Sequence, residues 1–366
     1  MTASTECVTI AADGISVTLD LAVGHIKTLA VERDGRHVAP LHRAPWTEEA
    51  HEPGMPAHLA RLSGDFLCAP FGPSDIDGSP SHGWPANSPW RHLGTQMIPG
   101  GSTARFELEK SVMGARVTKE FTLRHGHPFL YQRHLFSGGE GAVSVGLHMM
   151  VSLPQGGHLN FSPKLFAETP AVALEPDRAK GHSLLAYPSH FHDIKKAPRA
   201  DGGTANLTCY PFDRNHEDFV MMAEAPENKL AWASALRHHE GDLVLSLKRP
   251  SDFPLTLLWM SNGGRYYAPW NSRHRGVLGL EEARTYSLAG HKASIAPNPF
   301  SDQGIPTSIS LGASGDVDLR QVTGIMPVPP GWDRVTRVQA RDGKLAIISD
   351  NGEFAVPYDA GFVLRE

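Results

Sequence analysis

Three segments place a histidine or a glutamate inside a stiff loop or an apolar strand pattern. His82 lies in "SPSHGWPANSPW" (residues 79–90), a loop rich in proline and tryptophan. His148 lies in the apolar run "VSVGLHMMVSLP" (residues 143–154), and the apolar run "GVLGL" leads directly into Glu281. Side chains on strands and stiff loops are held in place, so these three residues are candidates for proton transfer.

Two imidazoles and a carboxylate are the groups that proton transfer on a neutral polyol needs. A sugar hydroxyl holds its proton too tightly to lose it unaided near pH 7, so a carboxylate accepts it while an imidazole donates a proton elsewhere. Each positioned transfer contributes roughly 10²–10⁴-fold to the rate. Burial raises the pKa of a carboxylate and improves its match to such a task.

Each of the three residues also has a purely structural interpretation. His148 on an apolar strand fits a hydrogen-bonded core histidine, Glu281 at a strand end fits a solvated rim residue, and His82 fits a loop residue bonded to the backbone. Glu282 follows Glu281, and neighbouring residues of a strand face opposite ways, so the sequence leaves open which acid faces a site. Only the combination of the three favours chemistry.

The order of these motifs resembles that of the hexose-phosphate mutarotases, members of the aldose 1-epimerase (galactose mutarotase-like) superfamily. Their series is "GG-I-P-x-C-x-P-x-F-G", "L-P-x-H-G-F-A-R-x-x-x-W", "L-H-T-Y-F" and "V-E-P". In this chain, "SGDFLCAPFG" (63–72) is similar to the first piece and "PSHGW" (80–84) to the second. Leu147-His148 and Leu280-Glu281 are similar to the third and fourth. The resemblance spans about residues 15–295 in family order.

The resemblance implies a galactose mutarotase-like supersandwich that works without a cofactor. By motif position it implies a general acid at His148, a general base at Glu281 and an assisting imidazole at His82. In the family reaction the base takes the proton of the anomeric hydroxyl while the acid protonates the ring oxygen. The ring opens, the C1–C2 bond rotates, and closure gives the other anomer.

The chain departs from the hexose-phosphate pattern where that pattern carries arginine. Ala86 stands in "HGWPAN", and Leu62 stands before "SGDF", with Arg61 one place away. Forked arginine donors bind phosphate tightly and directionally. Their absence at these two positions argues for a sugar without phosphate.

Further candidates for sugar contacts come from the rest of the chain. Asp213 in "PFDRN" is similar to an aspartate segment of the galactose mutarotases, although aspartate also closes turns. Arg265 in "NGGRYY" is a candidate for a substrate carboxylate or hydroxyl pair, and Arg61 is a third polar candidate. Aromatic rings stack on apolar sugar faces or fill core and loops. The aromatic candidates are Trp84, Trp90, Tyr266, Tyr267 and Trp270.

The elements that must position these residues are predicted to be strands. Apolar residues alternate in 15–21, 115–123, 243–247 and 254–260, whereas no stretch keeps helical apolar spacing over three turns. Glycine (36) and proline (29) are frequent, which is typical of many turns between short strands. The sequence predicts an all-β fold, one large antiparallel β-sandwich over residues 1–366. Residues 297–366 also fit a small β-rich extension.

Composition and charge limit the kinds of partner that the protein is expected to bind. A net charge of −5 gives no basic field for nucleic acid, and no window reaches the roughly 18 apolar residues of a membrane span. Cys7, Cys68 and Cys209 match neither a disulfide framework nor a zinc signature. Without a leader-like pattern at the amino terminus, we expect a cytoplasmic protein, monomer or homodimer, that binds a small sugar.

The chain has twenty histidines, which makes a metal site an alternative. Pairs such as His190 and His192, however, lack the spacing of a zincin motif and would only share one face of a strand. We therefore expect no metal and no other cofactor. The sequence favours an aldose 1-epimerase-like isomerase acting on an unphosphorylated, acidic or otherwise modified sugar. Two alternatives stay open: a carbohydrate-binding protein on the same fold, and a metal-dependent sugar lyase or isomerase.

Overall fold

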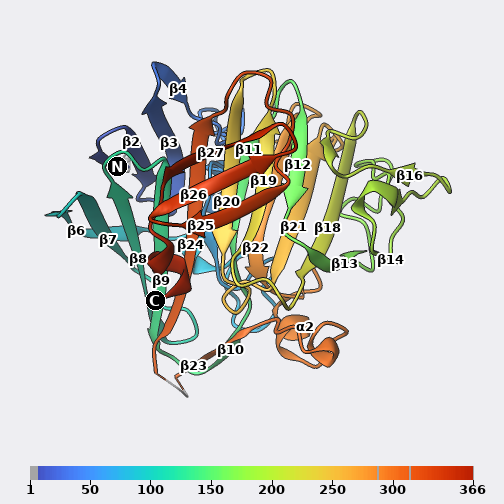
Figure 1. Cartoon of the computed structure of the whole chain (residues 1–366). Coiled ribbons are helices and arrows are strands. Elements are labelled where there is room, and N and C mark those ends of the chain that lie inside the picture. Colours follow the sequence, from blue (N-terminus) through green and yellow to red (C-terminus); the bar gives the residue numbers. More distant parts are fainter. Residues whose placement is uncertain (1–6, 287, 313–314, 366) are drawn as a thin grey trace.

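A computed structural model describes residues 7–286, 288–312 and 315–365. Two large antiparallel sheets pack face to face and form most of the molecule (Figure 1). The prediction of an all-β fold built on a large antiparallel sandwich is confirmed. Among the described residues, no helix has both the length and the apolar character that crossing a membrane requires.

The larger sheet has nine strands in the order β17-β12-β19-β20-β24-β9-β8-β7-β6. Their bounds are β6 Trp90–Ile98, β7 Gly101–Leu108, β8 Ala115–Arg124, β9 Phe129–Gly138, β12 Gly157–Phe161, β17 Cys209–Tyr210, β19 Ala231–Arg237, β20 Asp242–Lys248 and β24 Val317–Pro327.

The second sheet has seven strands in the order β14-β13-β18-β21-β22-β11-β5. Their bounds are β5 Leu67–Cys68, β11 Val145–Ser152, β13 Lys164–Thr169, β14 Ser189–Phe191, β18 His216–Glu224, β21 Leu255–Asn262 and β22 Val277–Arg284.

Smaller elements complete the chain. A four-stranded sheet contains β1 Cys7–Ala12, β2 Ile15–Asp20, β3 His25–Arg33 and β4 Arg36–Val38, and a three-stranded sheet contains β25 Arg337–Arg341, β26 Lys344–Ser349 and β27 Gly352–Pro357. Two further pairs join β10 Gly141–Val143 with β23 Ile309–Leu311, and β15 Ala197–Pro198 with β16 Thr204–Ala205. The helices are α1 Ala57–Ala60, α2 His291–Ile295, α3 Ala360–Leu364, and the 3-10 turns η1 Trp84–Ala86, η2 Ile194–Lys196 and η3 Ser301–Gln303.

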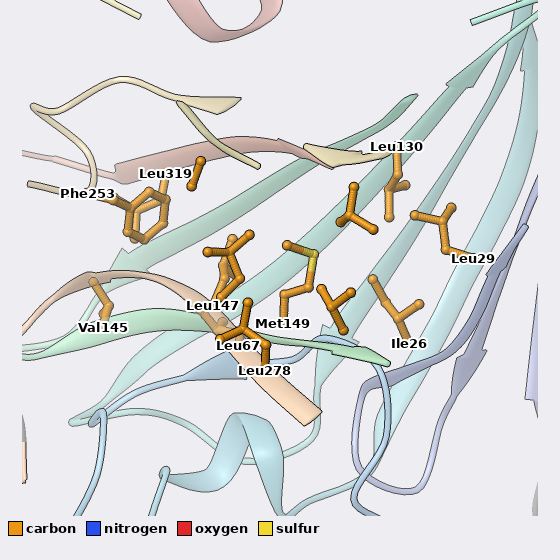
Figure 2. Packing of buried hydrophobic residues seen from close by; sticks show 14 of the residues in the cluster. Ile26, Leu29, Leu67, Leu130, Val145, Leu147, Met149, Phe253, Leu278 and Leu319 are labelled. Atoms are coloured by element: carbon orange, nitrogen blue, oxygen red, sulfur yellow. The ribbon is translucent and has the colours of Figure 1, made fainter. Parts of the chain in front are cut away.

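The main hydrophobic core fills the space between the two large sheets. Figure 2 shows Leu147, Met149 and Leu278 of the seven-stranded sheet beside Leu130 and Leu319 of the nine-stranded sheet. All five side chains are at most 2% exposed. Because alternate residues of a strand face opposite ways, burying Leu147 and Met149 between the sheets turns His148 to the outer face of the seven-stranded sheet.

The carboxyl-terminal sheet covers the other side of the nine-stranded sheet. Val338, Leu345 and Ile347 pack against Tyr131 and Leu243 of that sheet, and Figure 1 shows β25–β27 lying across it. Strand β24, in contrast, lies inside the nine-stranded sheet between β20 and β9.

Candidate functional site

A small cavity opens on the outer face of the seven-stranded sheet, with a volume of about 150 Å³. Its lining comes from strand side chains and from the segments before β5 and after β5, β13, β21 and β22. The residues that line it are His58, Leu59, Leu62, Phe66, Phe71, His82, His148, Leu174, Phe219, Trp259, Arg265, Trp270, Glu281 and Leu288. The three residues predicted to transfer protons, His82, His148 and Glu281, thus meet at one cavity.

His148 and Glu281 form the centre of this cavity. They are direct partners in the antiparallel pairing of β11 with β22, so their side chains stand on the same face of the sheet. The Nε2 atom of His148 lies 3.3 Å from Oε1 of Glu281. His148 is 7% exposed and Glu281 is 1% exposed, so water screens this contact weakly.

Burial shifts the pKa values of the two groups in opposite directions. Removal from water, together with the nearby carboxylates Asp65 and Glu282, raises the pKa of Glu281 well above its ordinary value. Removal from water lowers the pKa of His148 to about 3. Both carboxylate oxygens of Glu281 lack a hydrogen-bond partner among the described residues. Glu281 therefore holds a proton more readily than an exposed carboxylate does, and its oxygens remain free for a ligand.

Glu282 points the other way, into the sandwich. Its Oε2 accepts a hydrogen bond of 3.0 Å from the Thr256 hydroxyl and forms an ion pair with the Lys248 ammonium. Lys248 also pairs with Glu224 at 3.0 Å. Of the two adjacent acids, Glu281 is the one that faces the cavity.

The loop around His82 is held by its backbone. His82 has a φ of 65°, its N–H donates to the Gly72 carbonyl at 2.9 Å, and its ring nitrogen Nδ1 lies 3.3 Å from Sγ of Cys68. Gly83 is required after it, because a Cβ there would lie 1.8 Å from the Ala69 carbonyl oxygen. The imidazole rings of His82 and His148 are 5.3 Å apart, edge to face.

His58, on α1, is a third histidine of the site, and no sequence pattern pointed to it. Its backbone N–H and its ring Nδ1 both contact Oδ1 of Asn87, at 3.0 and 2.9 Å. Its ring lies 5.1 Å from that of His82. Burial lowers the pKa of both His58 and His82, so the cavity presents neutral imidazoles rather than cations.

Arg265 and Trp270, two of the proposed sugar contacts, line the cavity, with the guanidinium 4.5 Å from the centre of the Trp270 ring. Arg265 Nε donates to Oε1 of Glu175 at 2.8 Å, and Nη1 lies 3.6 Å from Oε1 of Glu217. Tyr267 also donates to Glu175, at 2.7 Å. The positive charge of Arg265 is thus balanced by two carboxylates of the protein.

Three other predicted sugar contacts lie outside the residues that line the cavity. Arg61 binds Asp20 through Nη2 at 2.7 Å, because it points toward the four-stranded sheet. Asp213 accepts from Arg199 at 2.9 Å at the surface, and Trp84 lies beneath the Lys110 ammonium, 5.4 Å from its ring centre. In each case a partner brought close by the fold holds the side chain away from the cavity.

The aromatic wall of the cavity also differs from the predicted set. Trp270 lines it, whereas Trp90 is buried and donates its indole N–H to the Pro85 carbonyl at 2.9 Å. Tyr266 and Tyr267 are absent from the cavity lining. Their place is taken by Phe66, which stacks on the His148 ring at 4.7 Å, and by Phe71, Phe219 and Trp259. Phe219 and Trp259 are cross-strand partners in the pairing of β18 with β21. This neighbour relationship depends on the register of the two strands.

The histidine pairs outside this cavity do not gather into a larger cluster. His190 and His192 lie edge to face at 5.1 Å, and Nδ1 of His190 lies 2.7 Å from Oε1 of Glu168. In the described part of the chain, no group of three or more His, Cys, Asp or Glu residues is placed to hold a metal ion.

Neither family models nor curated proteins match this chain, but many solved structures resemble it. A galactose mutarotase related enzyme from Lactobacillus acidophilus superposes with a TM-score of 0.56 at 12% identity, over 89% of this chain and 99% of that one. A galactose mutarotase-like protein from Lactobacillus casei gives 0.54 at 11% identity, over 88% and 100%. A Klebsiella pneumoniae protein provisionally described as an aldose 1-epimerase gives 0.56 at 14% identity, over 88% and 79%. Such distant likenesses establish architecture, and this chain has the galactose mutarotase-like fold.

Proposed function

We propose that the protein is an aldose 1-epimerase-like enzyme that interconverts the anomers of a neutral, unphosphorylated sugar. One observation carries the proposal: His148 and Glu281 face each other at 3.3 Å in a cavity, with both Glu281 oxygens free of protein hydrogen bonds. A sugar hydroxyl and ring oxygen would hydrogen-bond to these groups, which are otherwise buried without a partner at a cost in free energy.

The reaction needs one proton to leave the anomeric hydroxyl and one to reach the ring oxygen. Passing a proton from Glu281 to His148 creates a carboxylate that is a stronger base than usual, because its pKa is raised. It also creates an imidazolium that is a stronger acid than usual, because its pKa is lowered to about 3. Glu281 then takes the anomeric proton, His148 protonates the ring oxygen, and ring closure reverses both transfers.

The other imidazoles and the aromatic wall have supporting roles in this scheme. His82 and His58, whose pKa values are lowered by burial, offer ring nitrogens to sugar hydroxyls. Phe66 and Trp270 offer flat apolar surfaces to the faces of the ring, as aromatic side chains commonly do at ligand sites.

The charges around the cavity favour a neutral substrate over an acidic or phosphorylated one. Arg265 is the sole Lys or Arg among the cavity-lining residues, and Glu175 and Glu217 already neutralise it. Leu62 presents an apolar side chain at the cavity wall, and Ala86 is buried with its carbonyl bonded to His25. An anionic group here would face carboxylates without a free cation.

Saturation-transfer NMR on a sugar panel tests the proposal, because it measures exchange between anomers at equilibrium. We expect exchange faster than in buffer with wild-type protein and background exchange with Glu281→Gln. The control is Glu227→Gln, at an exposed loop glutamate. A protein that only binds sugar would raise its melting temperature with sugar while leaving exchange at the background rate, and this result would replace catalysis with binding.

A further inference from the structure

A second, larger hollow lies beside the cavity on the same side of the seven-stranded sheet. Its volume is about 620 Å³, several times that of the cavity, and we call it the β13–β14 groove. Eight of its thirteen lining residues are aliphatic or proline, among them Val172, Met221 and Leu288. Ligand sites commonly have volumes of about 300–1,000 Å³ with mostly apolar walls.

The groove adjoins the cavity. Leu288, which has a φ of 55°, lines both. Phe219 lines the cavity and Met221 lines the groove. These residues alternate along β18, so they stand on the same face of the sheet about 6.7 Å apart. A ligand seated over His148 and Glu281 would therefore extend past Leu288 into the groove.

The polar groups of the groove are mostly occupied by one another. Thr169 donates its hydroxyl to the Ala186 carbonyl at 2.7 Å and accepts from the Ser189 N–H at 2.8 Å. Glu168 is bound to His190 at 2.7 Å. Val172, in contrast, is 59% exposed. The groove thus offers apolar surface with few free hydrogen-bonding groups, which suits an alkyl or acyl chain better than the many hydroxyls of a second sugar ring.

We propose that the β13–β14 groove binds an apolar substituent carried by the sugar substrate on a hydroxyl other than the anomeric one. This inference rests on the proposed function, because ring opening requires a free anomeric hydroxyl at His148 and Glu281. The substrate class is then a sugar with an attached alkyl or acyl chain. Burying three methylenes of such a chain strengthens binding on the order of 50-fold.

The test compares glucose and galactose with their mono-octyl ethers, the ether placed at O2, O3, O4 or O6 in turn, and with maltose. We expect at least one ether to show a KM on the order of 50-fold lower than its parent sugar in the anomer-exchange assay. Val172→Trp, which fills the groove, is expected to remove this gain without changing exchange of the parent sugar. Met97→Trp, at a 74% exposed residue on β6, is the matched control.

The outcomes separate the two proposals. If parent sugars exchange but no ether gains affinity, or if maltose gains as much as the ethers, the apolar subsite is wrong and the proposed function stands. If no sugar exchanges, the proposed function fails. Calorimetric titration with the same ethers then shows whether the groove binds the octyl chain. Tighter binding of an ether than of its parent, weakened by Val172→Trp and not by Met97→Trp, supports the subsite, and equal or absent binding overturns it.

Discussion

His148 and Glu281 are cross-strand partners in the β11–β22 pairing, with Nε2 and Oε1 3.3 Å apart. The register of these two neighbouring strands thus determines the spacing of the proposed acid and base, and no loop contributes to it. A slip of one residue would send one of the two side chains into the sandwich. Groups carried on paired strands are held more precisely than groups on loops, which suits proton transfer.

We predict that His148→Asn lowers anomer exchange by roughly 10²–10⁴-fold, because it removes one of the two proton-transfer groups. Exchange is measured by saturation-transfer NMR, and thermal unfolding checks that the sheet persists. His37→Asn, at an exposed histidine, is the control and should exchange like wild type. Full activity in His148→Asn would remove this residue from the mechanism.

The pH profile of exchange should lack the acid limb of an ordinary histidine. The active pair holds one proton; burial lowers the pKa of His148 to about 3 and raises the pKa of Glu281 well above its ordinary value. A second proton therefore binds only in strong acid, and the single proton is lost only above the raised pKa of Glu281. We expect that kcat/KM does not fall as the pH decreases through about 6.5, because the His148 imidazole takes up a proton only near its lowered pKa of about 3. A tenfold fall per pH unit below about 6.5 would show an ordinary imidazole at work.

Gly83→Ala should both destabilise the protein and impair exchange. The new Cβ would lie 1.8 Å from the Ala69 carbonyl oxygen, at a φ of 72°. The matched control is Gly78→Ala in the same loop, where φ is 69° and a Cβ meets nothing within 4 Å. Both variants place alanine at a positive φ, but Gly83, with a ψ of 179°, also lies in a backbone region that essentially only glycine adopts. A larger loss in Gly83→Ala therefore measures the steric contact together with this backbone strain. Equal free energies of unfolding for the two variants would contradict this view of the His82 loop.

His134→Leu should stabilise the protein. His134 is 1% exposed on β9, and both ring nitrogens lack a hydrogen-bond partner among the described residues. A buried group without a partner costs about 1–3 kcal/mol, which leucine avoids. Burial and the Lys119 ammonium lower the pKa of His134 well below its ordinary value, against the opposing effect of Asp318.

The stabilisation by His134→Leu should also depend on pH. The folded state of wild type keeps His134 neutral while the unfolded state binds a proton below about pH 6.5, so its stability falls as the pH decreases. The variant loses this dependence, and its advantage should grow by up to about 1.4 kcal/mol per pH unit below about 6.5. Urea unfolding at several pH values measures it. A variant less stable than wild type at every pH would show that His134 has a partner it needs.

The parts of the fold that follow from alternation were predictable from the sequence. The runs at 15–21, 115–123, 243–247 and 254–260 correspond to β2, β8, β20 and β21. Strands β2 and β8 are buried mainly on one face, and that burial imposes the period of two, whereas β20 and β21 are buried on both faces. Strand order and register depend on contacts between distant segments, and no local pattern encodes them.

The residues of the candidate site were likewise only partly predictable from the sequence. His82, His148 and Glu281 were found from motif order, and the structure brings them to one cavity. His58 was missed because α1 is a single turn without periodicity. Arg61 and Asp213 have the chemistry of sugar ligands, but Asp20 and Arg199 hold them elsewhere. Partner choice of this kind is settled by the tertiary fold.

The central claim is that Glu281, paired with His148, exchanges the anomers of a neutral sugar. Saturation-transfer NMR on the sugar panel, with wild type, Glu281→Gln and Glu227→Gln side by side, tests it most directly. The claim predicts exchange above the buffer rate for wild type and Glu227→Gln, and a drop of roughly 10²–10⁴-fold toward the buffer rate for Glu281→Gln. Exchange in Glu281→Gln equal to that of wild type, with the fold intact, would contradict it.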